Sequence, residues 1–231
     1  MPSAGWLYEA SMNEPAQTID HESRWAPALA ILVVLLPLAV LPGHVHMLPG
    51  WVSYVAAPAI LTPMVAVAFT RGNTLWLRIE RTMIILAAAG YVANVTAELV
   101  DMVGLVTLHP GTANAFSLLS SSVAIWTVNV LMFALLYWQI DRGGPYARAS
   151  KLKVRPDWVF PQPSSPEDLP TDWHPVFLDY LYLGYNTATA FSPTDALPLT
   201  HRAKMLMMIE STISLLTMVV VVSRAINVIP S

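Results

Sequence analysis

Three polar side chains interrupt an apolar stretch of the sequence at helical spacing. Asn94 is followed four residues later by Glu98, and Asp101 comes three residues after that, so one helix face carries all three. If this helix crosses a membrane, an acid near the bilayer centre is costly unless it is paired, hydrated or protonated. The cluster predicts a proton or cation relay facing the interior of a helix bundle, or a structural cluster paired with Asn129 or with a hydroxyl group on the next helix.

A fourth polar position lies in the last apolar segment. Glu210 is followed by hydroxyl residues and comes about two turns after a pair of basic residues, Arg202 and Lys204. If this segment lines a pore, copies of Glu210 would form an acidic ring that attracts cations. The alternative is a hydrogen bond from Glu210 to a neighbouring helix.

The stretch from Asp172 to Asp195 contains an apolar helix that is too short to cross a membrane. Thr171 or Asp172 can cap a helix that has Pro175 in its first turn. That helix would extend to Ala190, about 15 residues or roughly 22 Å, whereas the hydrocarbon core is about 30 Å thick. We expect a re-entrant helix that enters the membrane and returns through irregular backbone. The alternative is an amphipathic helix lying at the interface.

The same stretch resembles the pore module of tetrameric cation channels. The resemblance starts with Asp179-Tyr180-Leu181-Tyr182, continues from Thr187 to Asp195, and ends with a basic residue and a long apolar helix. It covers the chain from Ala115 onward. It implies an outer helix, a pore helix, an inner helix and a filter formed by Thr189, Ala190, Phe191, Ser192, Pro193, Thr194 and Asp195. The whole chain also resembles a group of bacterial membrane proteins that carry the same Phe-Ser-Pro-Thr-Asp motif.

The filter departs from that of potassium channels. Ser192 and Thr194 stand where potassium channels have glycines, and Pro193 stands at the tyrosine position. Those glycines allow backbone angles that point the carbonyl groups inward. We therefore expect no potassium selectivity. Selection would instead use the Ser192 and Thr194 hydroxyl groups or a ring of Asp195 side chains.

The composition predicts an all-α integral membrane protein. Of the 231 residues, 55% are hydrophobic and 12% are charged, which is about half the charged share of soluble domains. Apolar segments long enough to form about five transmembrane helices lie at about 26–41, 51–70, 82–108, 115–140 and 203–228. The re-entrant helix would lie between the last two.

These segments suggest three parts. Residues 1–25 are expected to be a disordered acidic tail, and residues 26–113 a three-helix membrane domain. Residues 114–231 would form the pore-like module. It would contain an outer helix (115–140), a proline-rich linker (142–174), the re-entrant helix and loop (175–200) and an inner helix (203–228). We expect Trp158 and Phe160 of the linker to lie at the lipid interface.

The basic residues predict the orientation in the membrane. With five spans, one side holds eleven of the twelve lysines and arginines, and Arg224 lies alone on the other. Cytoplasmic segments carry such an excess, so the N-terminus and the linker should be cytoplasmic in the bacterial inner membrane. The re-entrant segment would then enter from the cytoplasm, opposite to potassium channels and as in ionotropic glutamate receptors.

Several other classes of protein are disfavoured. A net charge of −3 gives no reason to expect a nucleic-acid partner, and the lack of cysteine excludes disulfides and zinc–thiolate sites. There is no phosphate-binding glycine loop, no HExxH and no Gly-x-Ser-x-Gly motif, so we expect no enzyme activity. His44, His46 and His109 would lie on the same side of the membrane and could bind zinc or copper. Nothing fixes the distances between these side chains, so we expect neither a metal site nor a cofactor.

Together these features predict an oligomeric, homotetrameric cation channel in the lipid bilayer. It could pass monovalent or divalent cations, with the segment from Thr189 to Asp195 as its constriction. One alternative is a non-conducting membrane subunit or scaffold that keeps the pore-module shape. The other is a small proton- or cation-coupled transporter that uses Glu98 and Asp101.

Overall fold

The computed structural model describes residues 25–40, 51–70, 74–108, 115–149, 152–161, 173–189 and 196–228, and within these ranges the chain is mostly helical. The long helices are α2 (Trp25–Val40), α3 (Trp51–Phe69), α4 (Thr74–Leu108), α5 (Ala115–Ile140) and α8 (His201–Val228). The shorter elements are η1 (Asp141–Gly143), α6 (Pro145–Ala149), α7 (Phe177–Thr189), β1 (Trp158–Val159) and β2 (Leu197–Pro198). The all-α prediction is therefore confirmed, with one small strand pair added.

Each predicted apolar segment forms a helix at the predicted place. The largest difference is in α4, which begins at Thr74 rather than near residue 82. Its first two turns contain Arg78, Glu80 and Arg81, whose charges place these turns before the apolar stretch. The residues of the predicted N-terminal tail before Trp25 lie outside the described residues.

By length and composition alone, one segment of the described chain, Ser122–Gly143, is long and apolar enough to cross a membrane. The apolar stretches Trp25–Val34 and Pro58–Val67 are shorter. About two thirds of the Ser122–Gly143 window (67%) is buried inside the protein, and the core helix of a soluble protein can pass the same test. That five helices span a membrane thus stays a prediction.

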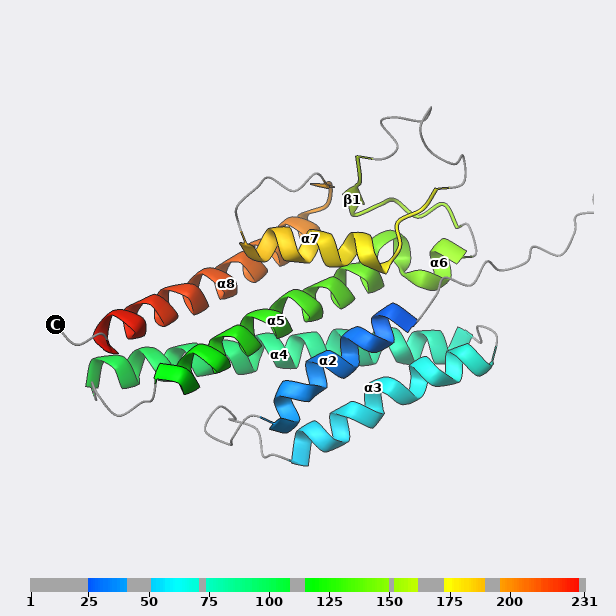
Figure 1. The fold of residues 1–231 in the computed structure, drawn as a ribbon. Coiled ribbons are helices and arrows are strands. Elements are labelled where there is room, and N and C mark those ends of the chain that lie inside the picture. The colour runs from blue at the N-terminus through cyan, green and yellow to red at the C-terminus, as the bar shows by residue number, and fades with distance from the viewer. Residues whose placement is uncertain are drawn as a thin grey trace, which may run out of the picture.

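The long helices alternate in direction along one bundle, with α5 packed against α2, α4, α7 and α8 (Figure 1). Near the start of α4, Arg81 Nη1 donates to Gly143 O just after α5 (2.9 Å), and at the start of α8, Arg202 Nη2 donates to Ile140 O (3.4 Å). The starts of α4 and α8 therefore lie beside the end of α5. We call this the linker end of the bundle.

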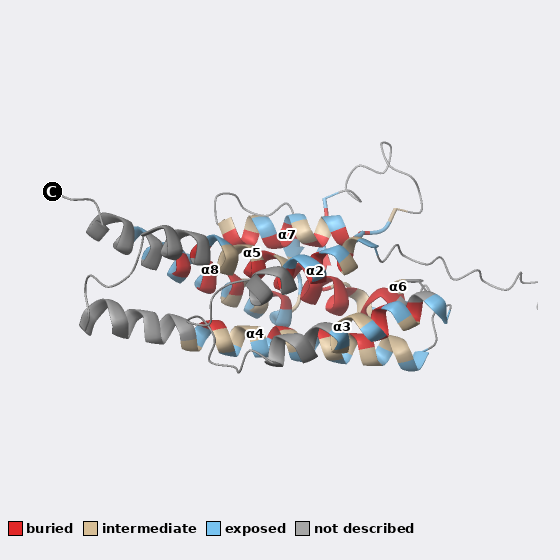
Figure 2. Ribbon diagram, turned by 60° about the horizontal axis from the view of Figure 1, so that its bottom comes forward, coloured by how far each residue is buried: buried red, intermediate tan, exposed pale blue. Residues whose placement is uncertain are grey.

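The hydrophobic core follows α5. Figure 2 shows the buried residues concentrated where α5 meets its neighbours. Phe133, Tyr137 and Trp138 are almost completely buried, and the same core includes side chains of α2, α3, α4, α7 and α8.

The linker contains structure that the sequence did not predict. Strands β1 and β2 pair antiparallel, with Trp158 opposite Pro198 and Val159 opposite Leu197. The prediction that Trp158 and Phe160 lie at the lipid interface is wrong, because both side chains are buried in the core. The Trp158 ring packs on the Tyr137 ring (4.8 Å between centroids), and its Nε1 donates to Met207 Sδ (3.3 Å).

Candidate functional site

The short helix α7 packs closely against α5 and α8. It begins at the linker end, where the Tyr180 hydroxyl donates to Asp141 Oδ2 (2.7 Å). Gly184 allows the close approach to α5. A Cβ atom built there would lie 3.1 Å from Val130 O and 3.3 Å from Glu210 Oε1.

The C-terminal end of α7 lies near the middle of α5 and about a third of the way along α8. Ser211 Oγ donates to Thr187 O (3.1 Å), and Ser211 is ten residues, or about 15 Å, along α8 from its first residue. On the other side, the Trp126 ring of α5 meets the edge of the Tyr185 ring (5.7 Å). After α7 the chain reaches β2, which returns to the linker end (Figure 1).

A polar cluster is buried where α5, α7 and α8 meet. Glu210 is completely buried, and its Oε2 accepts a 2.5 Å hydrogen bond from the Tyr137 hydroxyl. Asn129 Nδ2 donates to Ser214 Oγ (2.9 Å) and to Glu210 O (3.2 Å). Of the two interpretations of Glu210 offered by the sequence, this is the hydrogen bond to a neighbouring helix.

Two acceptor atoms in this cluster have no hydrogen-bond donor among the described residues. They are Glu210 Oε1 and Asn129 Oδ1, and both are buried. No ion pair joins Glu210 to a side chain in the described part of the molecule. A buried carboxyl group without a cation is costly in a low-dielectric environment. Glu210 is held in place by its hydrogen bond from Tyr137 and by its close packing against Gly184.

Gly184 provides a test of this packing. Gly184→Leu is expected to lower the free energy of unfolding by about 1–3 kcal/mol, because the side chain must displace the α5 backbone or Glu210. Gly90→Leu in α4 is the matched control, because a Cβ there meets nothing within 4 Å. Thermal unfolding in detergent micelles measures both. Equal effects of the two substitutions would contradict a close α5–α7 contact.

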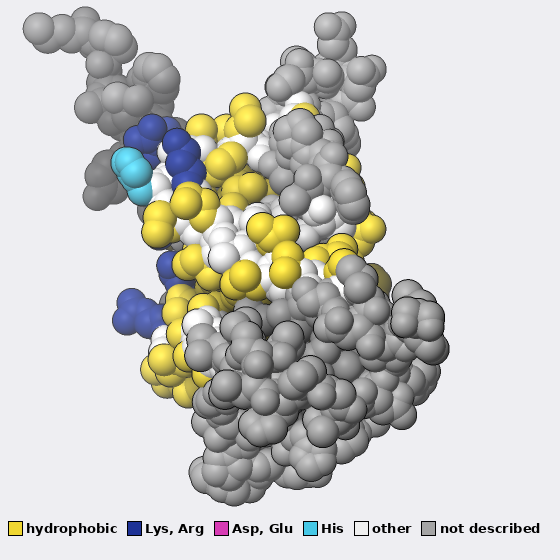
Figure 3. All heavy atoms as spheres, turned by 90° about the vertical axis from the view of Figure 1, so that its left-hand side faces the viewer, with side chains coloured by type: hydrophobic (Ala, Val, Ile, Leu, Met, Phe, Trp, Pro, Cys, Tyr) yellow, Lys and Arg dark blue, Asp and Glu magenta, His cyan; other side chains and the backbone are white. Residues whose placement is uncertain are grey.

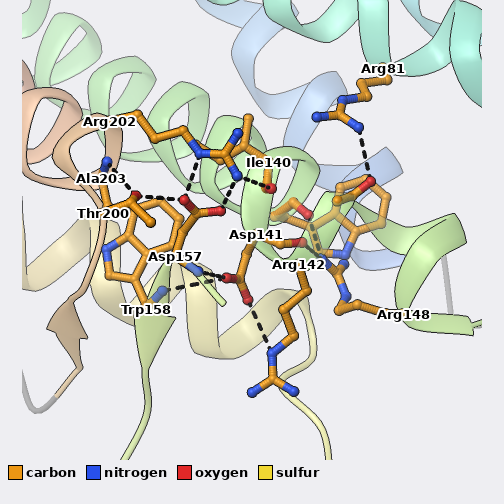
Figure 4. A network of polar contacts seen from close by, with 12 residues as sticks. Arg81, Ile140, Asp141, Arg142, Arg148, Asp157, Trp158, Thr200, Arg202 and Ala203 are labelled. Carbon is orange, nitrogen blue, oxygen red and sulfur yellow. Dashed lines mark hydrogen bonds and ion pairs between the residues drawn. The ribbon is translucent and has the colours of Figure 1, made fainter. Parts of the chain in front are cut away.

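A second polar network joins the linker to α8 at the linker end (Figure 4). Asp157 has no exposed side-chain surface, and its carboxylate accepts hydrogen bonds from Arg202 Nε and the Thr200 hydroxyl (both 2.6 Å) as well as from Arg202 Nη2. The hydrogen bonds from Arg202 to Asp157 raise the pKa of Arg202 above its ordinary value. Thr200 Oγ1 also accepts the N–H of Ala203, which caps the first turn of α8.

Asp141 extends this network to α7. Its Oδ1 accepts the backbone N–H groups of Asp157 (2.8 Å) and Trp158 (3.4 Å), while Oδ2 accepts the Tyr180 hydroxyl. Arg148 Nη1 donates to the carbonyl groups of Trp138 and Asp141, and its guanidinium lies 5.3 Å from the centre of the Tyr180 ring. One buried acid therefore holds the end of α5, the linker and the start of α7 together.

Neither Asp141 nor Asp157 was predicted as a site residue. Asp141 directly follows a segment predicted as a helix from its length, and Asp157 lies in the linker predicted from its proline content. Asp141 and Asp157 are 16 residues apart, and Asp157 and Arg202 are 45 residues apart. An acid directly after a long apolar helix was the only available signal.

No family model, curated protein or solved structure matches this chain.

The predicted filter lies mostly outside the described residues. Of its seven residues the structure describes Thr189, whose hydroxyl donates to the carbonyl groups of Tyr185 (3.0 Å) and Asn186 (3.2 Å). Residues 190–195 are not described. Asn94 is half-buried in α4. Glu98 and Asp101 belong to the same helix, but their side chains lie outside the described part.

Proposed function

We propose that this chain is an integral membrane protein with five spanning helices, α2, α3, α4, α5 and α8. Large apolar side chains on the outer surfaces of these helices support the proposal, because soluble proteins rarely expose large apolar patches. On α8 they are Met205, Met208, Leu215, Leu216, Met218, Val219 and Val222. Hydrophobic side chains also dominate the described surface seen from one end of the bundle (Figure 3).

The charges support an orientation with the linker end in the cytoplasm. The basic side chains that the structure describes belong to the first turns of α4 and α8, to η1 and α6, and to the linker; the side chain of Arg224, near the end of α8, is not among them. Hydrogen bonds join these elements at the linker end. Cytoplasmic ends of membrane helices carry such an excess of arginine and lysine.

Within that membrane protein, we propose that α7 is a re-entrant pore helix. The observation that carries this proposal is the hydrogen bond from Ser211 to Thr187, about 15 Å along α8, which is half of a bilayer core of about 30 Å. A helix that starts at one end of a bundle, stops halfway and is followed by a return to the same end has the course of a pore loop. Flanking helices α5 and α8 cover its backbone, as the bilayer requires.

A pore of this kind needs several copies, because one re-entrant segment cannot surround an ion. We propose a homotetramer whose copies meet along α8. Six of the exposed positions on α8 follow one another at spacings of three and four residues, the repeat by which helices pack side by side. They are Met205, Met208, Thr212, Leu215, Val219 and Val222.

The proposed activity is passive cation conduction through a constriction between Thr189 and Asp195. Because Ser192, Pro193 and Thr194 replace the residues that align carbonyl groups in potassium filters, the proposed pore does not select potassium. Side-chain hydroxyl groups and the Asp195 carboxylates would supply the oxygen atoms.

One observation favours a second candidate, a non-conducting subunit with the same module. Glu210 points into its own protomer, toward Tyr137, and the exposed stripe of α8 is apolar apart from Thr212. An inner helix with such a stripe offers ions little polar surface, and a hydrophobic constriction closes a pore by dewetting.

Cation flux into liposomes separates the two candidates. We expect the wild-type protein to pass cations and Asp195→Ala to abolish the flux, because the acidic ring is removed. Glu167→Ala, which removes an acid from the linker, is the matched control and should leave the flux unchanged.

The symmetry of the particle completes this test. A fourfold particle without flux under any condition would favour the non-conducting subunit. A monomeric particle would contradict the pore, because no single copy can enclose one.

A further inference from the structure

A cavity of about 280 Å³ opens at the linker end, between the first turns of α4 and the turn that follows α5. It lies apart from the α5–α7–α8 polar cluster. Its lining combines two guanidinium groups, a hydroxyl group and the glycine turn before α6: Thr74, Leu77, Arg78, Glu80, Arg81, Gln139, Gly143, Gly144 and Pro145. The volume is close to the lower limit of sites for small organic ligands, so it fits a compact polar group.

The charge available in this cavity is positive. Arg78 is exposed and makes no hydrogen bond or ion pair with a residue in the described ranges. Arg81 is half-buried, and one of its N–H groups is donated to Gly143 O. Glu80 also lines the cavity, but its side chain is 1% exposed and Oε1 accepts an N–H from Gln139 (3.0 Å).

Two arginines three residues apart on α4, both lining one cavity, favour a phosphate group. Each presents several N–H donors in a planar fork that matches the spacing of phosphate oxygens. The first turn of α4 lies at the same place, with Thr74 in the lining, and the partial positive charge of a helix N-terminus adds to the attraction.

The surroundings of the cavity indicate where such a phosphate would come from. Phe69, the last residue of α3, is 83% exposed, and Leu75 next to Thr74 is 60% exposed. Large apolar side chains beside arginines are typical of the level where lipid headgroups meet acyl chains. Basic pockets between helices on the cytoplasmic side of membrane proteins bind anionic headgroups.

We infer that Arg78 and Arg81 form a binding site for the phosphate of an anionic phospholipid at the cytoplasmic side of the bundle. This inference rests on the proposed membrane placement but not on ion conduction. A lipid held there would connect α4 to the η1–α6 turn, and through that turn to the end of α5.

The test uses the full chain in detergent micelles and counts bound lipid by native mass spectrometry. Phosphatidylglycerol is the anionic probe and phosphatidylcholine the zwitterionic comparison. We expect Arg78→Gln to weaken phosphatidylglycerol binding by about tenfold or more, the effect of losing charge-assisted hydrogen bonds. Arg155→Gln removes an exposed charge from the linker and should weaken binding by no more than about fivefold.

Arg78→Lys keeps the charge but removes the fork, and we expect it to bind phosphatidylglycerol less tightly than the wild type does. Arg78→Lys also tests the site if the Arg78→Gln variant does not fold. Equal weakening by Arg78→Gln and Arg155→Gln, or no preference over phosphatidylcholine, would overturn the inference. Binding of inorganic phosphate that depends on Arg78, without binding of phosphatidylglycerol, would overturn the lipid as its source.

Cation flux measured on the same preparations keeps the two proposals separate. Lipid binding that depends on Arg78 in a protein without flux supports this site and counts against conduction. Flux without selective lipid binding supports conduction and counts against this lipid site.

Discussion

Arg202→Met is expected to lower the free energy of unfolding by about 3–5 kcal/mol, because it leaves a buried carboxylate without its cation. Asp157 has no exposed side-chain surface, and without Arg202 its remaining side-chain partner is the Thr200 hydroxyl. The reverse change is milder. Asp157→Asn leaves Arg202, whose side chain is 52% exposed, free to be hydrated. We expect Asp157→Asn to lower the free energy of unfolding by about 1–2 kcal/mol, as for a lost hydrogen bond to a charged group.

Thermal or denaturant unfolding in micelles measures this asymmetry. Lys204→Met is the matched control, since Lys204 is also an exposed cation in the first turns of α8 but lies outside the Asp157 network. The double variant Asp157→Asn, Arg202→Met should lose less stability than the sum of the two single variants. Additive losses, or equal losses from Arg202→Met and Lys204→Met, would show that the ion pair does not hold the linker to α8.

The positions of the helices could be predicted because long apolar stretches are bounded by basic residues and prolines. The predicted 115–140 segment coincides with α5, and α7 differs from its predicted range by one or two residues at each end. The predicted cap of α7 was wrong, because the helix begins at Phe177, after Pro175 and well after Thr171 and Asp172. The N–H of Val176 is accepted instead by Asp179 Oδ2 in the first turn (2.7 Å).

The network at the linker end could not be predicted in the same way. Asp141, Asp157 and Arg202 come from three separate segments, and their pairing depends on how α5 and α8 pack. Strands β1 and β2 have two residues each, too few to give a period of two. Proline content disfavours a long helix in the linker, whose described residues include the five-residue helix α6, but it says nothing about whether Trp158 is buried.

The direction of Glu210 was likewise undetermined by spacing. Its position on α8 is compatible with a pore-facing ring and with a contact to another helix. Packing decides between them in the structure. A Cβ at position 184 would lie 3.1 Å from Val130 O and 3.3 Å from Glu210 Oε1, so Gly184 leaves room for Glu210 beside the Tyr137 hydroxyl inside the protomer.

The inward direction of Glu210 leads to the second large effect. Glu210→Ala is expected to lower the free energy of unfolding by about 2–5 kcal/mol, because it leaves a cavity and an unpaired Tyr137 hydroxyl. Glu210→Gln keeps an oxygen that can accept from Tyr137, and its amide group fills the same space. We expect the free energy of unfolding of Glu210→Gln to lie within about 1 kcal/mol of the wild-type value, the size of one neutral hydrogen bond. Unfolding in micelles measures both variants.

The same pair of variants also tests where ions would pass. If Glu210 faces the protomer interior, Glu210→Gln should retain any cation flux that the wild type shows, since the charge takes no part in the path. Adding Tyr137→Phe to Glu210→Ala should lower the free energy of unfolding little further, because the hydroxyl group left without a partner is then removed as well. A folded Glu210→Gln variant with strongly reduced flux would contradict this view. Glu210 would then belong to the conduction path, and α8 would have to rotate from the described position for its carboxylate to reach the pore.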